Sequence, residues 1–122
     1  MVNMIEKFED LRIWQEGHGL TLEIYKITRD YPKNEIYGVI SQLRRASSSI
    51  PANIVEGFYR HSTKELVQFL FNARGSAGEV IYFLLLSVDL GYIKNSKYLE
   101  LRNRCEILIK SINALINSLK NK

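Results

Sequence analysis

The 122-residue sequence has few residues that interrupt regular structure: two prolines and seven glycines, spread thinly. This scarcity favours a few long elements over many short ones joined by turns. The single cysteine, Cys105, excludes an internal disulfide and fits a reducing compartment. The longest apolar stretch, residues 80–88, is about half the length of a membrane span. Residues 1–7 lack the basic start and apolar run of a signal peptide, so we expect a soluble cytoplasmic protein.

The composition is that of one ordinary globular domain, which we expect to span residues 1–122. The formal net charge is +4, and it is unevenly distributed. Residues 1–60 hold eight Lys/Arg and eight Asp/Glu, whereas residues 61–122 hold nine against five. A monomer of this charge would bind a polyanion weakly, but several copies in a ring would present a much stronger field. The alternative is an ordinary solvated surface.

Apolar residues recur every three or four positions along four segments, at about residues 10–31, 35–59, 63–90 and 96–120. Pro32 ends the first segment, and Gly91 suits the left-handed position after the third. No segment shows the alternating pattern of a strand. Short connections between four helices predict an all-α protein, an antiparallel up-down-up-down four-helix bundle.

Local signals suggest how three of these helices are shaped. Asn34 is a candidate N-cap for the second helix, and Ser62 with Glu65 forms a capping box for the third. Pro51 lies within the second helix, where it removes one backbone hydrogen bond. We expect a kink rather than a break there, with hydroxyls of Ser47 to Ser49 helping to satisfy the backbone.

Features typical of catalysis or of metal binding are scarce. The two histidines, His18 and His61, lie on different segments, and the sequence has no Glu-x-x-His pair. Cys105 falls on a core position, which favours a buried thiol over a nucleophile. Residues 75–78 are small and glycine-rich but lie within a helical pattern, unlike a phosphate-binding loop. We therefore expect no metal, no cofactor and no enzymatic activity.

A polar stripe runs beside the apolar stripe of the second helix, and another follows the third. A solvated face explains such stripes most simply. The alternative is a structural network between helices, in which charges are paired because unpaired burial is costly. A catalytic role for Arg45, Glu56 and Glu79 is a weaker third interpretation. The candidate network comprises Gln42, Arg45, Ser49, Asn53, Glu56, Ser76 and Glu79.

Six short motifs, in a fixed order across nearly the whole chain, resemble one family of proteins. They are Asp10-Leu11-x-x-Trp14-Gln15, Tyr31-Pro32-x-x-Glu35-x-Tyr37-Gly38, Gln42-Leu43-Arg44-Arg45-Ala46, Ser49-Ile50-Pro51-Ala52-Asn53-Ile54-x-Glu56-Gly57, Gly75-Ser76-x-x-Glu79 and Leu90-Gly91-Tyr92. The chain resembles the small four-helix-bundle proteins encoded in intervening sequences of bacterial 23S ribosomal RNA genes, which are related to accessory proteins of diversity-generating retroelements. Ser48 and Ala77 depart from the family pattern, which has an aliphatic residue and a leucine there.

The resemblance implies a homo-oligomer, usually a pentameric ring, with no established enzymatic activity. In the retroelement relatives, the basic surface of the ring engages RNA and a reverse transcriptase. For this chain we expect binding of structured RNA or DNA through a basic surface. The alternative is a scaffold that recruits a protein partner, such as a reverse transcriptase, with little direct contact to nucleic acid. The candidate phosphate-binding residues are Arg44, Arg45, Arg60, Lys94, Lys97, Arg102, Arg104 and Lys110.

Overall fold

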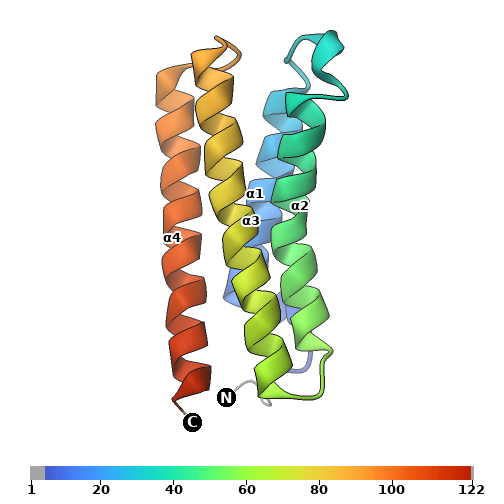
Figure 1. Ribbon diagram of the computed structural model, residues 1–122, viewed down its shortest axis with the longest axis vertical. Helices are drawn as coiled ribbons and strands as arrows, with labels where there is room; N and C mark the ends of the chain where they lie inside the picture. The colour runs from blue at the N-terminus through green and yellow to red at the C-terminus, as the bar shows by residue number, and fades with distance from the viewer. Residues whose placement is uncertain (1–4, 122) are drawn as a thin grey trace.

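The computed structural model describes residues 5–121, and four α-helices dominate it. They are α1 (Arg12–Thr28), α2 (Val39–Phe58), α3 (Thr63–Asp89) and α4 (Asn95–Lys120). Two 3₁₀ turns, η2 (Phe8–Asp10) and η3 (Lys33–Glu35), precede α1 and α2, and residues 5–121 contain no strand. In Figure 1 the helices stand side by side, with α1 and α3 rising and α2 and α4 descending. The prediction of an all-α protein with four helices is confirmed.

The connection between α1 and α2 differs from the prediction, because α1 ends at Thr28 and α2 begins only at Val39. Asn34 lies inside η3 and does not cap α2, so that prediction is wrong. Gly38 precedes α2, and the Glu35 carboxylate accepts a hydrogen bond from the Val39 amide at 3.3 Å. The side chain of Glu35, which is longer than that of Asn34, therefore binds the start of α2, which the prediction placed directly after Asn34.

Both ends of α3 follow the local sequence signals. At its start, the Ser62 hydroxyl accepts a hydrogen bond from the Glu65 amide at 3.1 Å. The Glu65 carboxylate returns to the Ser62 hydroxyl rather than to the Ser62 amide, so only half of the capping box forms as predicted. At its end, Gly91 has a φ of +80°, and the Tyr92 amide donates to the Ser87 carbonyl at 2.9 Å. This is a Schellman motif, which glycine accommodates without strain.

Helix α2 continues through Pro51. Proline has no N–H, so the Ser47 carbonyl lacks its usual partner within the helix. The Thr21 hydroxyl on α1 lies 2.9 Å from this carbonyl oxygen and also 2.9 Å from that of Gly17. The Ser48 hydroxyl instead reaches the Arg44 carbonyl at 2.8 Å. A contact from the neighbouring helix therefore compensates for the proline, in place of the adjacent serines.

One apolar core runs along the inside of the bundle. Its fully buried members come from all four helices and include Leu20, Ile24, Leu43, Ile50, Ile54, Leu70, Leu84, Leu101, Leu108 and Ile112. Helices adjacent in sequence pack extensively, most of all α2 with α3, whereas α1 and α4 share far fewer contacts. Among the described residues, no helix has the length and apolar character needed to cross a membrane.

Candidate nucleic-acid interface and the polar line between α2 and α3

Polar side chains from α2 and α3 meet along the contact between these helices. The Arg45 guanidinium forms an ion pair with Glu79 at 2.5 Å, and its Nε donates to Gln42 Oε1 at 3.1 Å. The side chains of Arg45 and Glu79 are 52% and 41% exposed. This pair therefore lies at the surface edge of the interface, where water screens it and its contribution to stability is small.

A second, neutral group follows one turn further along α2. The Ser76 hydroxyl of α3 lies 2.9 Å from that of Ser49. The Asn53 amide donates to the Ser49 carbonyl at 2.8 Å and to the Ser49 hydroxyl at 3.0 Å. Since all three side chains are half-buried, these bonds satisfy polar atoms that would otherwise be costly to place between two helices. Gln42, Arg45, Ser49, Asn53, Ser76 and Glu79 are called the α2–α3 polar line below.

Glu56 lies outside this polar line, although the sequence grouped it with Arg45. Its carboxylate pairs with Arg60 at 3.2 Å, and Arg60 also approaches Glu65 at 3.7 Å. The Arg60 guanidinium lies 4.9 Å from the centre of the Phe69 ring. The structure thus separates the candidate network into two groups, one in the middle of the helices and one near the α2–α3 turn. Both groups of contacts are of the kind that fixes the register of one helix against the next.

Five of the eight candidate cations make contacts within the chain. Arg45 and Arg60 are paired as described, and Lys97 lies 3.4 Å from both Glu23 and Glu100. Arg102 pairs with Glu106 at 3.3 Å and donates to the Tyr98 hydroxyl at 2.7 Å. This hydrogen bond, followed by the contact with Glu106, raises the pKa of Arg102. Arg44 donates to the Thr28 hydroxyl at 2.9 Å. A phosphate would have to compete with most of these contacts.

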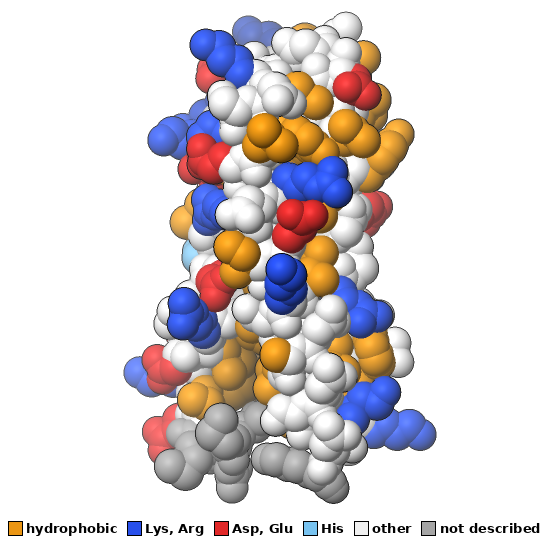
Figure 2. Space-filling view, turned by 90° about the vertical axis from the view of Figure 1, so that its left-hand side faces the viewer, with side chains coloured by type: hydrophobic (Ala, Val, Ile, Leu, Met, Phe, Trp, Pro, Cys, Tyr) orange, Lys and Arg blue, Asp and Glu red, His pale blue; other side chains and the backbone are white. Residues whose placement is uncertain are grey.

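The remaining candidates, Lys94, Arg104 and Lys110, form no ion pair with any residue in the range 5–121. Lys94 and Lys110 are exposed, and Arg104 is half-buried. Within Asn95–Lys120, α4 carries five Lys/Arg and two Glu, a net charge of +3. Figure 2 faces the side of the molecule where α4 lies, and basic side chains are spread along its whole height. Most of the net positive charge therefore belongs to this one helix.

Large apolar side chains remain exposed near the end of α3 and the start of α4. Tyr82 and Leu85 are 55% and 40% exposed, and Leu90 is 49% exposed. Leu99, on the first turns of α4, is 55% exposed. Apolar surface of this kind on a bundle is a candidate contact for a partner.

The geometry offers little for catalysis. Cys105 is fully buried, and burial raises the pKa of its thiol to about 12. A thiol in this state is a poor nucleophile. No group of three or more His, Cys, Asp or Glu side chains suited to a metal ion occurs within the part of the chain that the structure describes.

Sequence reasoning missed two groups of polar residues. Thr21 supports the backbone at Pro51, and the only hint was a hydroxyl within the apolar stripe of α1. Arg74 of α3 donates to the Asn113 side chain of α4 at 2.7 Å, which no local pattern indicates. Both contacts join residues far apart in sequence, so a single helical pattern contains no sign of them.

Comparison with known proteins places these features in a family. A search of solved structures finds a protein of unknown function, from the S23 ribosomal protein family of Bacteroides thetaiotaomicron, with a TM-score of 0.76. It is 23% identical in sequence, and the match covers 85% of this chain and 97% of that one, which supports the fold. A search of curated proteins gives no match. The model of the 23S rRNA-intervening sequence protein family matches residues 9–114. The resemblance seen in the sequence motifs is thus confirmed, and the chain belongs to the 23S rRNA-intervening sequence protein family.

Proposed function

We propose that this protein is a non-enzymatic homo-oligomer, a ring of up-down-up-down bundles, that binds structured RNA or DNA in the cytoplasm through a basic surface centred on α4. The observation that carries the proposal is the concentration of a net charge of +3 on this one helix. Lys94 and Lys110 are exposed at its start and middle, and neither is neutralised by a carboxylate of residues 5–121. A phosphate backbone fits such a surface, since Lys and Arg contact phosphates without reading sequence.

Oligomerisation supports the same proposal, because one copy carries a formal charge of only +4. Five such copies, the number usual for the family, would carry +20 in one ring, and affinity for polyanions grows with the number of phosphates contacted. The exposed Tyr82 and Leu85 of α3, with Leu90 directly after it, supply apolar surface that a neighbouring copy would cover. Light scattering across a range of protein concentrations tests this step, and a monomeric mass throughout would overturn the ring.

Binding is tested by fluorescence anisotropy with an RNA hairpin and a DNA duplex of matched sequence, at low and at physiological salt. We expect affinity that falls steeply with salt. Arg104→Glu/Lys110→Glu should weaken binding strongly, because it reverses two cations that have no carboxylate partner within residues 5–121. Lys26→Glu/Lys64→Glu is the matched control, with the same change in charge at two exposed positions outside α4. Equal loss in both variants would show that binding is not centred on α4.

A second candidate function is a scaffold that recruits a protein, such as a reverse transcriptase, with little contact to nucleic acid. The observation in its favour is that Arg45, Arg60, Lys97 and Arg102 are already paired with carboxylates of the chain. Flat anisotropy curves at both salt concentrations, together with capture of a purified reverse transcriptase by the immobilised protein, would favour this function over nucleic-acid binding.

A further inference from the structure

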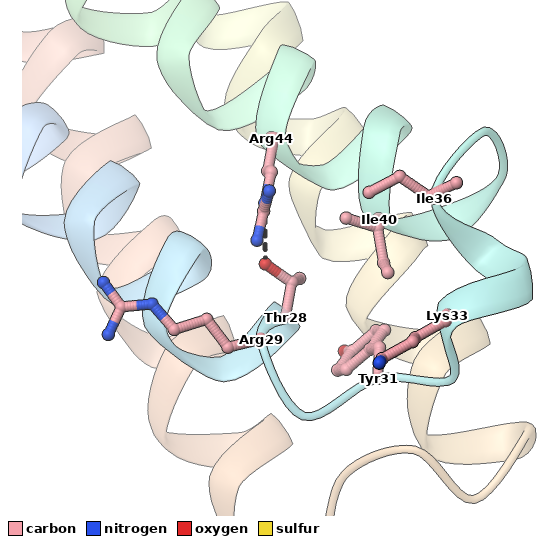
Figure 3. Close-up of a pocket in the computed structure, with 7 residues that line it drawn as sticks. All are labelled: Thr28, Arg29, Tyr31, Lys33, Ile36, Ile40 and Arg44. Carbon is pink, nitrogen blue, oxygen red and sulfur yellow. Dashed lines mark hydrogen bonds between the residues drawn. The ribbon is translucent and has the colours of Figure 1, made fainter.

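A pocket of about 340 Å³ opens where α1 ends and α2 begins (Figure 3). Its volume is at the lower end of the range for small-molecule sites. The apolar part of its wall consists of Tyr31, Ile36 and Ile40. Tyr31 and Ile40 are almost fully buried, whereas Ile36 is 48% exposed at the rim. The pocket therefore offers a flat or apolar group a surface that is already fixed by the core.

Arg44 provides a positioned cation on the wall of the pocket. Its Nε donates to the Thr28 hydroxyl at 2.9 Å, and its guanidinium lies 4.6 Å from the centre of the Tyr25 ring. Both contacts hold the side chain without neutralising it. No carboxylate of residues 5–121 pairs with this guanidinium. Its remaining N–H groups are free to bind an anion in a fixed direction.

Lys33 and Arg29 add two further positive charges. Both line the pocket, both are exposed, and neither forms an ion pair with any described residue. In Figure 3 the Lys33 side chain extends in the direction of Tyr31, whereas the Arg29 guanidinium is turned outward, away from Ile36 and Ile40. No Asp or Glu lines the pocket, and the neighbouring Asp30 is absent from its wall. Three cations without an acidic counterpart favour a dianion over a single carboxylate.

We propose that this pocket binds a nucleoside monophosphate unit, with its phosphate between Lys33 and Arg44 and its base against Ile36 and Ile40. A phosphate monoester carries close to two negative charges at neutral pH, which matches the uncompensated cations. The apolar wall provides the contact that inorganic phosphate could not use. Such a unit is supplied either by a free nucleotide or by an unpaired nucleotide of an RNA. The second source rests on the proposed nucleic-acid function, and the first does not.

The test is an NMR titration of the full-length protein with adenosine 5′-monophosphate, adenosine and inorganic phosphate, following the methyl groups of Ile36 and Ile40. We expect the nucleotide to bind at least about tenfold more tightly than either of the other two, because only it uses both parts of the pocket. Lys33→Glu should weaken nucleotide binding by about tenfold or more. Lys64→Glu is the matched control, since it reverses an exposed lysine at the start of α3, away from both the pocket and α4, and it should leave the affinity unchanged.

Each other result overturns the proposal in a defined way. If adenosine binds as tightly as the nucleotide, the cations do not contribute to binding. If inorganic phosphate binds as tightly as the nucleotide, the apolar wall does not contribute. Equal weakening by Lys33→Glu and Lys64→Glu would indicate general charge attraction. Competition by a short single-stranded RNA identifies RNA as the source. If the nucleotide binds in the pocket but RNA neither competes nor binds α4, the pocket stands and the proposed nucleic-acid function fails.

Discussion

The contact between α2 and α3 and the contact between α1 and α4 are built differently. Small residues let α2 and α3 approach closely, and a Cβ atom on Gly57 would lie 3.0 Å from both Leu66 Cδ1 and Phe69 Cβ. Between α1 and α4, a Cβ atom on Gly19 would meet only the end of the Arg104 side chain, at 3.4 Å. An ion pair between Glu23 and Lys97, at 3.4 Å, spans this second contact.

The difference teaches how the bundle is closed. Helices that follow one another in sequence are joined directly by one connection and share extensive contacts, whereas α1 and α4 meet only because the bundle returns on itself. Long, charged side chains at the α1–α4 contact adjust to a change in the distance between the two helices more easily than a close backbone contact does. Helix α4, which carries most of the net positive charge, is therefore also loosely packed on the side that faces α1.

The largest effect that we expect concerns access to the Cys105 thiol on α4. Burial raises the pKa of this thiol to about 12, from an ordinary 9.0. Near pH 8 this leaves about a thousandfold less thiolate than in the unfolded chain, and burial also blocks the reagent. Labelling by a thiol reagent should thus be at least a thousandfold slower in buffer than in denaturant. A difference within about tenfold would mean that α4 separates readily from the rest of the bundle.

A bulky residue at Gly57 tests the close α2–α3 contact. Gly57→Val would place its Cβ atom 3.0 Å from the Cβ of Phe69, which is fixed to the backbone of α3. We expect a loss of about 2–3 kcal/mol in the free energy of unfolding, measured by urea denaturation. Gly75→Val is the control, because no atom beyond the adjacent backbone of α3 itself lies within 4 Å of its Cβ position. Similar small losses in both variants would contradict the close packing of α2 against α3.

The contact between α1 and α2 at Pro51 has a smaller expected effect. Thr21→Val removes the hydroxyl that lies 2.9 Å from the Ser47 carbonyl and leaves that buried oxygen without a donor. The expected loss is about 1–2 kcal/mol in the free energy of unfolding. In a Pro51→Ala background, the restored N–H of residue 51 serves the same carbonyl, so Thr21→Val should cost less there. An identical loss in both backgrounds would show that Thr21 acts through packing alone.

The sequence predicted the features that depend on neighbours in the chain. The four helices, the Ser62 cap and the turn at Gly91 each follow from residues within one or two helical turns. The Asn34 cap failed because Glu35 reaches the Val39 amide after a 3₁₀ turn that the helical pattern did not reveal.

The candidate sites could be predicted only in part for a related reason. A polar stripe on α2 shows that Arg45 needs a partner, but the choice of Glu79 over Glu56 depends on how α2 faces α3. In the same way, the eight candidate cations could be found by their charge, and some carboxylate partners, such as Glu106 of Arg102, lie only one helical turn away. A partner on another helix, such as Glu23 of Lys97, could not be found in this way. Lys33 and Arg29 were missed because a pocket forms only when the ends of α1 and α2 come together.

The smallest expected effect is a gain in stability at the α1–α4 contact. Gly19→Ala adds a methyl group that meets only the flexible end of Arg104, at 3.4 Å, and replaces a glycine inside α1. Alanine favours the helix by about 0.5–1 kcal/mol over glycine, so the free energy of unfolding should rise by about that amount. Arg104→Ala in the same chain separates the helix preference of alanine from the contact with α4, because it removes the only atom beyond the adjacent backbone of α1 that lies within 4 Å of the new methyl group. If Gly19→Ala is destabilising with Arg104 present and stabilising without it, α4 lies closer to α1 than the loose packing implies, and the contrast between the two contacts narrows.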